Sequence, residues 1–174
     1  MTAKVPAVGV EPLPDPLIEP AVRLALAEDL QADGDRSQAE KEYAAVLTDA
    51  PNQTVALNNL AWLDLEDGKN DAALALARKA YDEAPRASSV ADTFGWALVQ
   101  TGNIDDALPI LRTAHQEAPK DTQIRFHYAY ALLKTGATEQ ARHELQAVSE
   151  EQPLGPEGNQ ARSLLAGLPK VAGR

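Results

Sequence analysis

The sequence contains no cysteine, and aromatic residues make up only 5% of its 174 positions. Without cysteine the chain forms no disulfide, no thiolate metal site and no cysteine-linked lipid anchor. No apolar run approaches the ~20 residues of a membrane-spanning helix, and the first ten residues lack the continuous hydrophobic segment of a secretory signal. These absences predict a soluble protein, cytoplasmic as written, or periplasmic if the chain is a fragment of a secreted or lipidated parent.

Basic residues are also scarce relative to acidic ones. Sixteen Lys and Arg face 26 Asp and Glu, so the formal net charge at pH 7 is −10. Such a charge repels polyanions, which argues against nucleic acid or an anionic membrane as the main partner. Another protein or a peptide is the expected partner.

Three residue types recur at an interval of 34 positions without a slip. A small residue, an alanine and a proline at fixed offsets in such a period are typical of a helical repeat array, which is more often a binding surface than an enzyme. The three columns are Gly34, Gly68, Gly102 and Gly136; Ala39, Ala73, Ala107 and Ala141; and Pro51, Pro85, Pro119 and Pro153.

The period predicts an order of segments along the chain. Each unit reads as a first helix, a turn at the glycine, a second helix and the proline. The first helix carries its apolar residues at the seventh, eighth and eleventh places, which in the first unit are Leu26, Ala27 and Leu30. The predicted segments are a disordered proline-rich leader (1–19), four units within 20–155 (20–53, 54–87, 88–121 and 122–155), a capping helix (156–168) and a tail (169–174).

Each column has a physical reason. The glycine follows the first helix, where a left-handed backbone conformation is wanted. The alanine lets the two helices of a unit approach closely, and the proline ends the second helix because it pushes its predecessor out of the helical region. In the last segment, Gln160, Arg162 and Ser163 predict a polar outer side, which a terminal repeat requires.

The units resemble tetratricopeptide repeats over about 135 residues. The third unit is nearest to that pattern, with Phe94, Gly95, Gly102, Ala107, Leu111, Ala114 and Pro119. The resemblance implies an all-α, right-handed superhelical solenoid of helix-turn-helix repeats that binds other proteins. Asp64 departs from the pattern because a large apolar residue is expected there, so we expect that unit to use Leu63 or Leu65 instead.

Three strings resemble a narrower family, the tetratricopeptide lipoproteins of exosortase systems. The lipid-attached leader of that family, with its cysteine, is absent from this sequence. This resemblance implies a role in a bacterial envelope, exopolysaccharide or protein-sorting system. The strings are LNNLAWL (57–63), DTFGWALVQTG (92–102) and DDALPILRTA (105–114).

The first helices should line a concave groove with their second, fifth, ninth, twelfth and thirteenth places, and the sixth place should lie near its edge. The ninth place is aromatic in three units, and aromatic anchors carry much of the energy at interfaces. The alternative is that these rings pack between adjacent helices and stiffen the superhelix. The candidate partner-binding residues are Asn58, Asn59, Trp62, Asp92, Trp96, Phe126, His127 and Tyr130.

Catalysis, cofactors and metals find no support in the sequence. The three histidines, His115, His127 and His143, fall at different repeat places, and no glycine loop for phosphate is present. Tetratricopeptide repeats are known to bind acidic C-terminal peptides with a clamp of five residues. In this sequence only Asn59 matches one of those five places. We therefore expect a non-enzymatic scaffold that binds a peptide or helix of a partner in the groove. The alternative is a structural, self-assembling spacer module of a larger complex.

Overall fold

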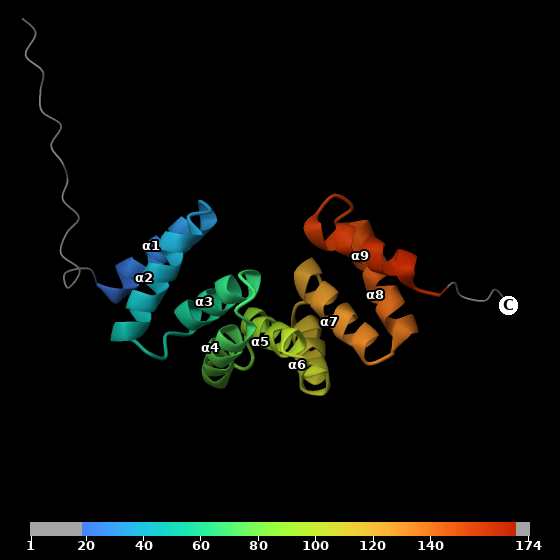
Figure 1. Cartoon of the computed structure of the whole chain (residues 1–174), viewed down its shortest axis with the longest axis horizontal. Coiled ribbons are helices and arrows are strands. Elements are labelled where there is room, and N and C mark those ends of the chain that lie inside the picture. Colours follow the sequence, from blue (N-terminus) through green and yellow to red (C-terminus); the bar gives the residue numbers. More distant parts are fainter. Residues whose placement is uncertain (1–18, 170–174) are drawn as a thin grey trace, which may run out of the picture.

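The computed structural model describes residues 19–169, which form nine α-helices and no strand (Figure 1). The predicted leader, except Glu19, and the predicted tail, except Pro169, lie outside the described residues. The helices are α1 (Pro20–Ala32), α2 (Arg36–Asp49), α3 (Thr54–Glu66), α4 (Asn70–Glu83), α5 (Ser88–Gln100), α6 (Ile104–Glu117), α7 (Thr122–Lys134), α8 (Thr138–Glu151) and α9 (Pro156–Gly167).

A glycine of the 34-residue column sits in the turn inside each of the first four helix pairs. Gly34, Gly68, Gly102 and Gly136 have φ between 73° and 84°. An L-residue with a side chain pays a steric cost in this left-handed region, whereas glycine does not. The predicted conformation of these glycines is confirmed. Any other residue at these positions would strain the backbone.

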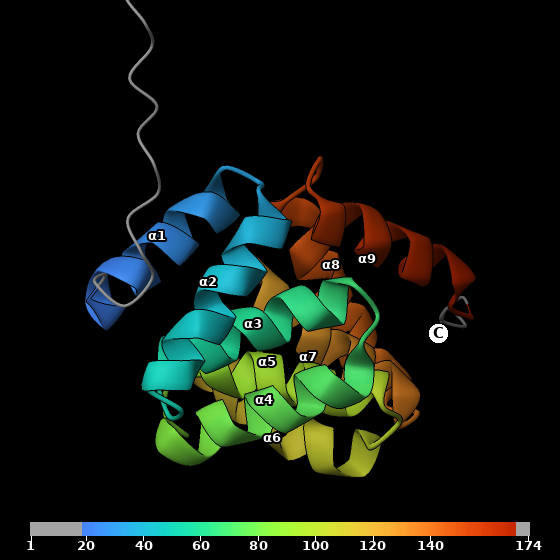
Figure 2. The ribbon, with the colours of Figure 1, turned by 60° about the vertical axis from the view of Figure 1, so that its left-hand side comes forward.

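The helix pairs stack into an arch, with α1–α2 and α8–α9 rising on either side of the central pairs (Figures 1 and 2). The first helix of one pair contacts the first helix of the next: α3 contacts α5, α5 contacts α7, and α7 contacts α9. In the described part of the chain, α2, α4, α6 and α8 make no comparable contact with one another. The odd-numbered helices therefore lie on the inside of the curve and are called the inner helices below; α2, α4, α6 and α8 are the outer helices.

Small residues bring the two helices of each pair together. The alanine column Ala39, Ala73, Ala107 and Ala141 is completely buried. In the third pair, a Cβ placed on Gly95 of α5 would lie 2.6 Å from Cγ of Leu111 on α6. Leu111 is itself completely buried. Glycine at position 95 is therefore needed for packing, not for backbone freedom.

Asp64 illustrates how one unit accommodates a departure from the repeat pattern. Leu63 and Leu65 on either side of it are 1% and 7% exposed, which confirms the expectation that this unit uses them. The Asp64 carboxylate itself pairs with Lys69 Nζ at 3.2 Å in the following turn. Asp67 and Asp64 together raise the pKa of Lys69, because both accept hydrogen bonds from its ammonium group.

The two ends of the array differ. Leu26 on α1 was expected in the apolar spine, but its side chain is 40% exposed, and Val22 one turn earlier is 60% exposed. No further pair in the described residues stacks on this side of α1, so these side chains lose the cover that later units provide. At the other end, α9 buries Ala161 and packs Leu164 and Leu165 inward, while Gln160, Arg162 and Ser163 are exposed.

Candidate functional site

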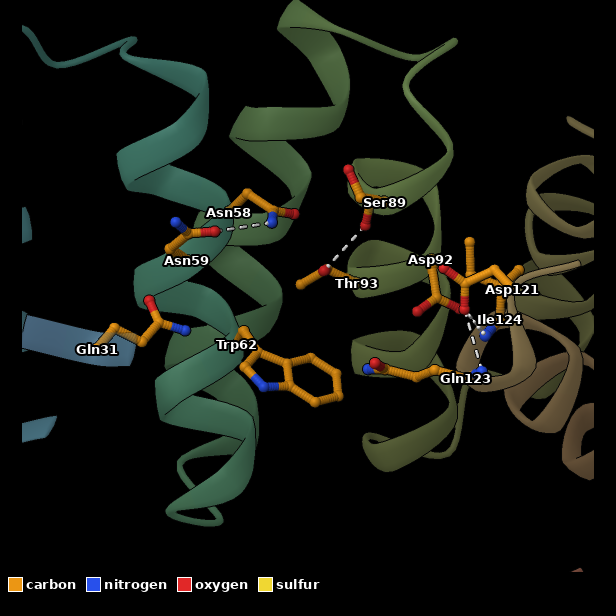
Figure 3. Close-up of a pocket in the computed structure, with 10 residues that line it drawn as sticks. All are labelled: Gln31, Asn58, Asn59, Trp62, Ser89, Asp92, Thr93, Asp121, Gln123 and Ile124. Carbon is orange, nitrogen blue, oxygen red and sulfur yellow. Dashed lines mark hydrogen bonds between the residues drawn. The ribbon is translucent and has the colours of Figure 1, made fainter. Parts of the chain in front are cut away.

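A pocket of about 200 Å³ lies on the inner side of the arch and is formed by four inner helices (Figure 3). Trp62 of α3 and Gln123 of α7 point toward each other across the space between the helices, and Gln31 of α1 points toward α3. The other lining residues are Asn58, Asn59, Ser89, Asp92, Thr93, Asp121 and Ile124. We call this surface, together with the neighbouring Glu28, the inner groove.

Trp62 belongs to an aromatic cluster that lies beside the pocket and spans α3, α5 and α7. The ring of His127 stacks on Trp96 with centroids 4.1 Å apart and planes 13° apart, and it lies 5.9 Å from the ring of Trp62. Tyr130 meets Trp96 edge-on at 5.4 Å. Trp62, Trp96 and Tyr130 remain half-buried, so each both packs against a neighbour and keeps part of its surface open.

A buried hydrogen-bonded pair joins α5 to α7 beneath this cluster. His127 Nδ1 lies 2.9 Å from both Oδ1 and Oδ2 of Asp92, and each residue is 4% exposed. A carboxylate accepts, so His127 donates from Nδ1, which sets the orientation of the ring under Trp96. Removing either partner would leave a buried polar group unsatisfied, which is costly. The pair therefore positions the aromatic cluster.

A second polar network holds the asparagines of α3. Asn59 Nδ2 donates to the hydroxyl oxygen of Tyr43 at 3.0 Å, and that hydroxyl donates to Gln31 Oε1 at 2.7 Å. Burial raises the pKa of Tyr43, so its hydroxyl stays protonated and able to donate. Asn58 Nδ2 donates to Asn59 Oδ1 at 3.3 Å, whereas Asn58 Oδ1 is buried without a hydrogen-bond partner among the described residues.

The structure brings most of the predicted site residues together, but Asp92, Phe126 and His127 are buried, each only 4% exposed. Asn58, Asn59, Trp62 and Asp92 line the pocket, and Trp96, His127 and Tyr130 form the cluster beside it. Phe126, expected to point into the groove, is 4% exposed and packs in a core with residues of α8 and α9. The fifth place of the preceding unit, Asp92, is equally buried, and the Phe126 ring lies 6.0 Å from that of His127.

Several lining residues were not among the predicted ones. Ser89 and Gln123 occupy the second place of their units and Gln31 the twelfth, so the repeat register contained the signal that finds them. Asp121 lies just before α7, where its Oδ1 accepts from the backbone N–H groups of Gln123 and Ile124. The sequence alone does not mark Asp121 as a site residue, because helix capping is sufficient to explain an aspartate at that position.

The remaining histidines lie on the outer side. His115 and His143 approach the same carboxylate, Glu144, at 3.7 Å and 3.2 Å. Sequence spacing does not reveal this convergence, because residues of α6 and α8 meet only after stacking. Burial lowers the pKa of His115. Within residues 19–169 no group of three His, Cys, Asp or Glu side chains is placed to hold a metal ion.

The stacked helix pairs place the chain in the class of α-helical repeat solenoids. Sequence profiles described as tetratricopeptide repeat match residues 24–88 and 98–168, which together exceed half of the chain. The chain belongs to the tetratricopeptide repeat family, whose fold supports a role as a protein-interaction scaffold. A comparison with curated proteins found no match.

Solved structures share the fold at low sequence identity. The chain is similar to YrrB, a TPR protein with an unusual peptide-binding site, at 19% identity and a TM-score of 0.65, covering 84% of this chain and 77% of that one. TTC0263, a thermophilic TPR protein of Thermus thermophilus, gives 21% identity and a TM-score of 0.67, covering 85% and 80%. The O-GlcNAc transferase of Thermobaculum terrenum (mutant K341M) gives 24% and 0.68, but the match spans 79% of this chain and only 27% of that one.

These identities establish the fold alone. The described helices include none that is both long and apolar enough to cross a membrane.

Proposed function

We propose that the inner groove binds an extended peptide segment of a partner protein, so that the chain acts as a scaffold. The observation that carries this proposal is the pocket shared by four inner helices, with the half-buried indole of Trp62 in its wall. An aromatic side chain left partly open beside amide and hydroxyl groups is a typical anchor for a peptide.

The spacing of the inner helices favours an extended occupant. Packed helices lie about 8–10 Å apart, and an extended chain advances about 3.3 Å per residue, so each inner helix faces about three peptide residues. Four inner helices then accommodate about ten residues. Asn58 and Gln123 each carry an amide that both donates and accepts, which suits the backbone of such a peptide.

The fold comparison adds support by analogy. YrrB is described as having an unusual peptide-binding site, and its fold covers most of this chain. At 19% identity the position of that site does not transfer residue by residue. The proposal for this chain therefore depends on its own groove residues.

Selection from a random peptide library tests this function. Immobilised protein should enrich peptides whose binding falls at least about tenfold in Trp62→Ala, as expected for an interface anchor. The matched control is Ile110→Ala, which truncates a half-buried apolar residue of the outer helix α6. Enriched peptides that bind Trp62→Ala as tightly as the unchanged protein would overturn the assignment of the groove.

A second candidate function, self-assembly, is favoured by the exposed apolar face of α1. Val22 and Leu26 are exposed there, at 60% and 40%. Copies that stack through this face would cover these side chains. Light scattering across a concentration series should then show larger species that disappear in Leu26→Ser, whereas a strict monomer at every concentration would exclude this candidate.

We also propose, from the resemblance of three sequence strings alone, that the partner belongs to a bacterial envelope, exopolysaccharide or protein-sorting system. The genes beside the coding sequence test this proposal. Neighbours of unrelated function would count against it.

A further inference from the structure

We propose that the inner groove selects a positively charged partner segment: an extended peptide that presents lysine or arginine side chains to Trp62, Glu28 and Asp121. This inference rests on the proposed function and adds the chemistry of the ligand. Such a cationic ligand is opposite in charge to the acidic C-terminal peptides bound by the clamp described above, of which this sequence has only Asn59.

The first argument is the charge of the inner helices. α3 and α5, which form the middle of the groove, contain no lysine or arginine. The residues that line the pocket include no basic side chain but two carboxylates, Asp92 and Asp121. Glu28 lines the adjoining hollow, which shares Gln31 and Asn59 with the pocket. A cationic peptide therefore meets no basic side chain in the pocket and meets carboxylates at Glu28 and Asp121.

The second argument is the supply of a free acceptor. Asp121 uses Oδ1 for both backbone bonds at the start of α7, so its Oδ2 remains for a ligand. Asn58 Oδ1 also has no hydrogen-bond partner among the described residues, but it is buried, so Asp121 Oδ2 is the acceptor that a ligand meets. Lysine and arginine heads carry only donors. The unmet hydrogen-bonding capacity of the groove thus matches these two side chains.

The third argument is the aromatic surface. Indole faces attract lysine and arginine more strongly than other aromatic rings do. At the end of the same aromatic column, Lys134 Nζ already lies 5.1 Å from the ring centroid of Tyr130. Within the described residues no Lys or Arg lies over Trp62 or Trp96, which leaves their open surfaces to a cation from the partner.

Asp92 plays a different part. Both of its oxygens lie 2.9 Å from Nδ1 of His127, so its hydrogen-bonding capacity is used within that buried pair. Glu28 and Asp121 are exposed and carry the recognition. Changing them leaves the Asp92–His127 pair and the aromatic cluster intact.

Calorimetric titration with three peptides of about ten residues tests the inference. The probes alternate threonine with lysine, with glutamine or with glutamate. We expect the lysine peptide to bind about tenfold more tightly than the glutamine peptide at low salt, and the difference to shrink as ionic strength rises. The glutamate peptide should bind most weakly.

Paired variants separate the groove from the general negative charge of the protein. Glu28→Gln with Asp121→Asn removes two charges from the groove, and asparagine caps a helix as well as aspartate does. Glu117→Gln with Asp105→Asn removes two charges from exposed sites on the outer helix α6. The groove pair should weaken the lysine peptide about threefold to tenfold without affecting the glutamine peptide. The outer double variant should bind the lysine and glutamine peptides with affinities within about twofold of those of the unchanged protein.

Three results would overturn the inference. Glutamine or glutamate peptides that bind as tightly as the lysine peptide would remove the charge preference while leaving peptide binding in place. If the groove double variant and the outer double variant lost the same affinity for the lysine peptide, the charge preference would come from the overall negative charge of the protein and not from the groove. No binding by any of the three peptides would overturn it as well, and the library selection with Trp62→Ala would then decide separately whether the groove binds peptides at all.

Discussion

The inner helix α5 and the outer helix α6 belong to one repeat unit but differ sharply in burial. α5 buries nine of its 13 residues, whereas α6 buries three of 14. An inner helix touches its outer partner, the next inner helix and the previous outer helix, while an outer helix turns one face to solvent. On an inner helix, a large side chain that stays open, such as Trp96, is therefore the exception that indicates a surface for a partner.

The largest expected effect comes from the buried hydrogen-bonded pair between the inner helices α5 and α7. Asp92→Ala leaves buried His127 without its acceptor and should lower the free energy of unfolding by about 2–4 kcal/mol. The outer control Asp105→Ala removes an exposed carboxylate and should change it by less than about 0.5 kcal/mol. Urea unfolding followed by circular dichroism measures both; equal losses would contradict the difference between inner and outer helices.

Gly95→Ala tests the close packing between the two helices. The new methyl group would meet Leu111, which is completely buried and has no free space to move into. Overpacking should outweigh the gain in helix propensity and destabilise the fold by about 1–3 kcal/mol. The double variant Gly95→Ala/Leu111→Ala should be less destabilised than the sum of the two single changes. A more stable Gly95→Ala protein would refute the close approach.

Gly102→Ala tests the turn between the same helices, where nothing crowds the added methyl group. Its φ of +83° alone should cost about 1 kcal/mol. Thermal unfolding would show a smaller fall in Tm than for Gly95→Ala. If the order were reversed, backbone conformation would matter more than helix packing in this unit.

The smallest effect is the pH dependence of the outer face. Burial holds the pKa of His115 below its ordinary value of 6.5. The unfolded chain therefore takes up a proton there before the folded chain does, so stability should fall as pH drops below 6.5 through the folded pKa. Urea midpoints at pH 7 and pH 5 measure this fall, and His115→Gln should reduce it. If His115→Gln lost as much stability between pH 7 and pH 5 as the unchanged protein, the loss would come from other titratable groups.

Much of the fold was predictable because its causes are local and repeated. The glycine column needs a left-handed turn and the alanine column a close helix approach, and both requirements can be recognised from residue type at a fixed period. The use of Leu63 and Leu65 beside Asp64 was also predictable from their position next to the missing spine residue. The division of the chain into units at residues 20, 54, 88 and 122 and the capping role of α9 remain predictions.

The site was less predictable because it depends on how units stagger against one another. Asp92 and His127 are 35 residues apart, one place beyond the repeat period, so their pairing follows from the offset between α5 and α7. Leu26 is exposed because no described pair precedes α1. A repeat register treats all units alike and cannot anticipate such end effects.

The most direct test of the central claim, that ligands bind the inner groove, uses the two tryptophans of the chain. Both belong to the inner aromatic cluster, so their indole N–H resonances can be followed by NMR while the lysine peptide is added. We predict that both resonances shift along one binding curve that matches the calorimetric affinity. Unmoved indole resonances with saturating peptide bound would contradict the claim.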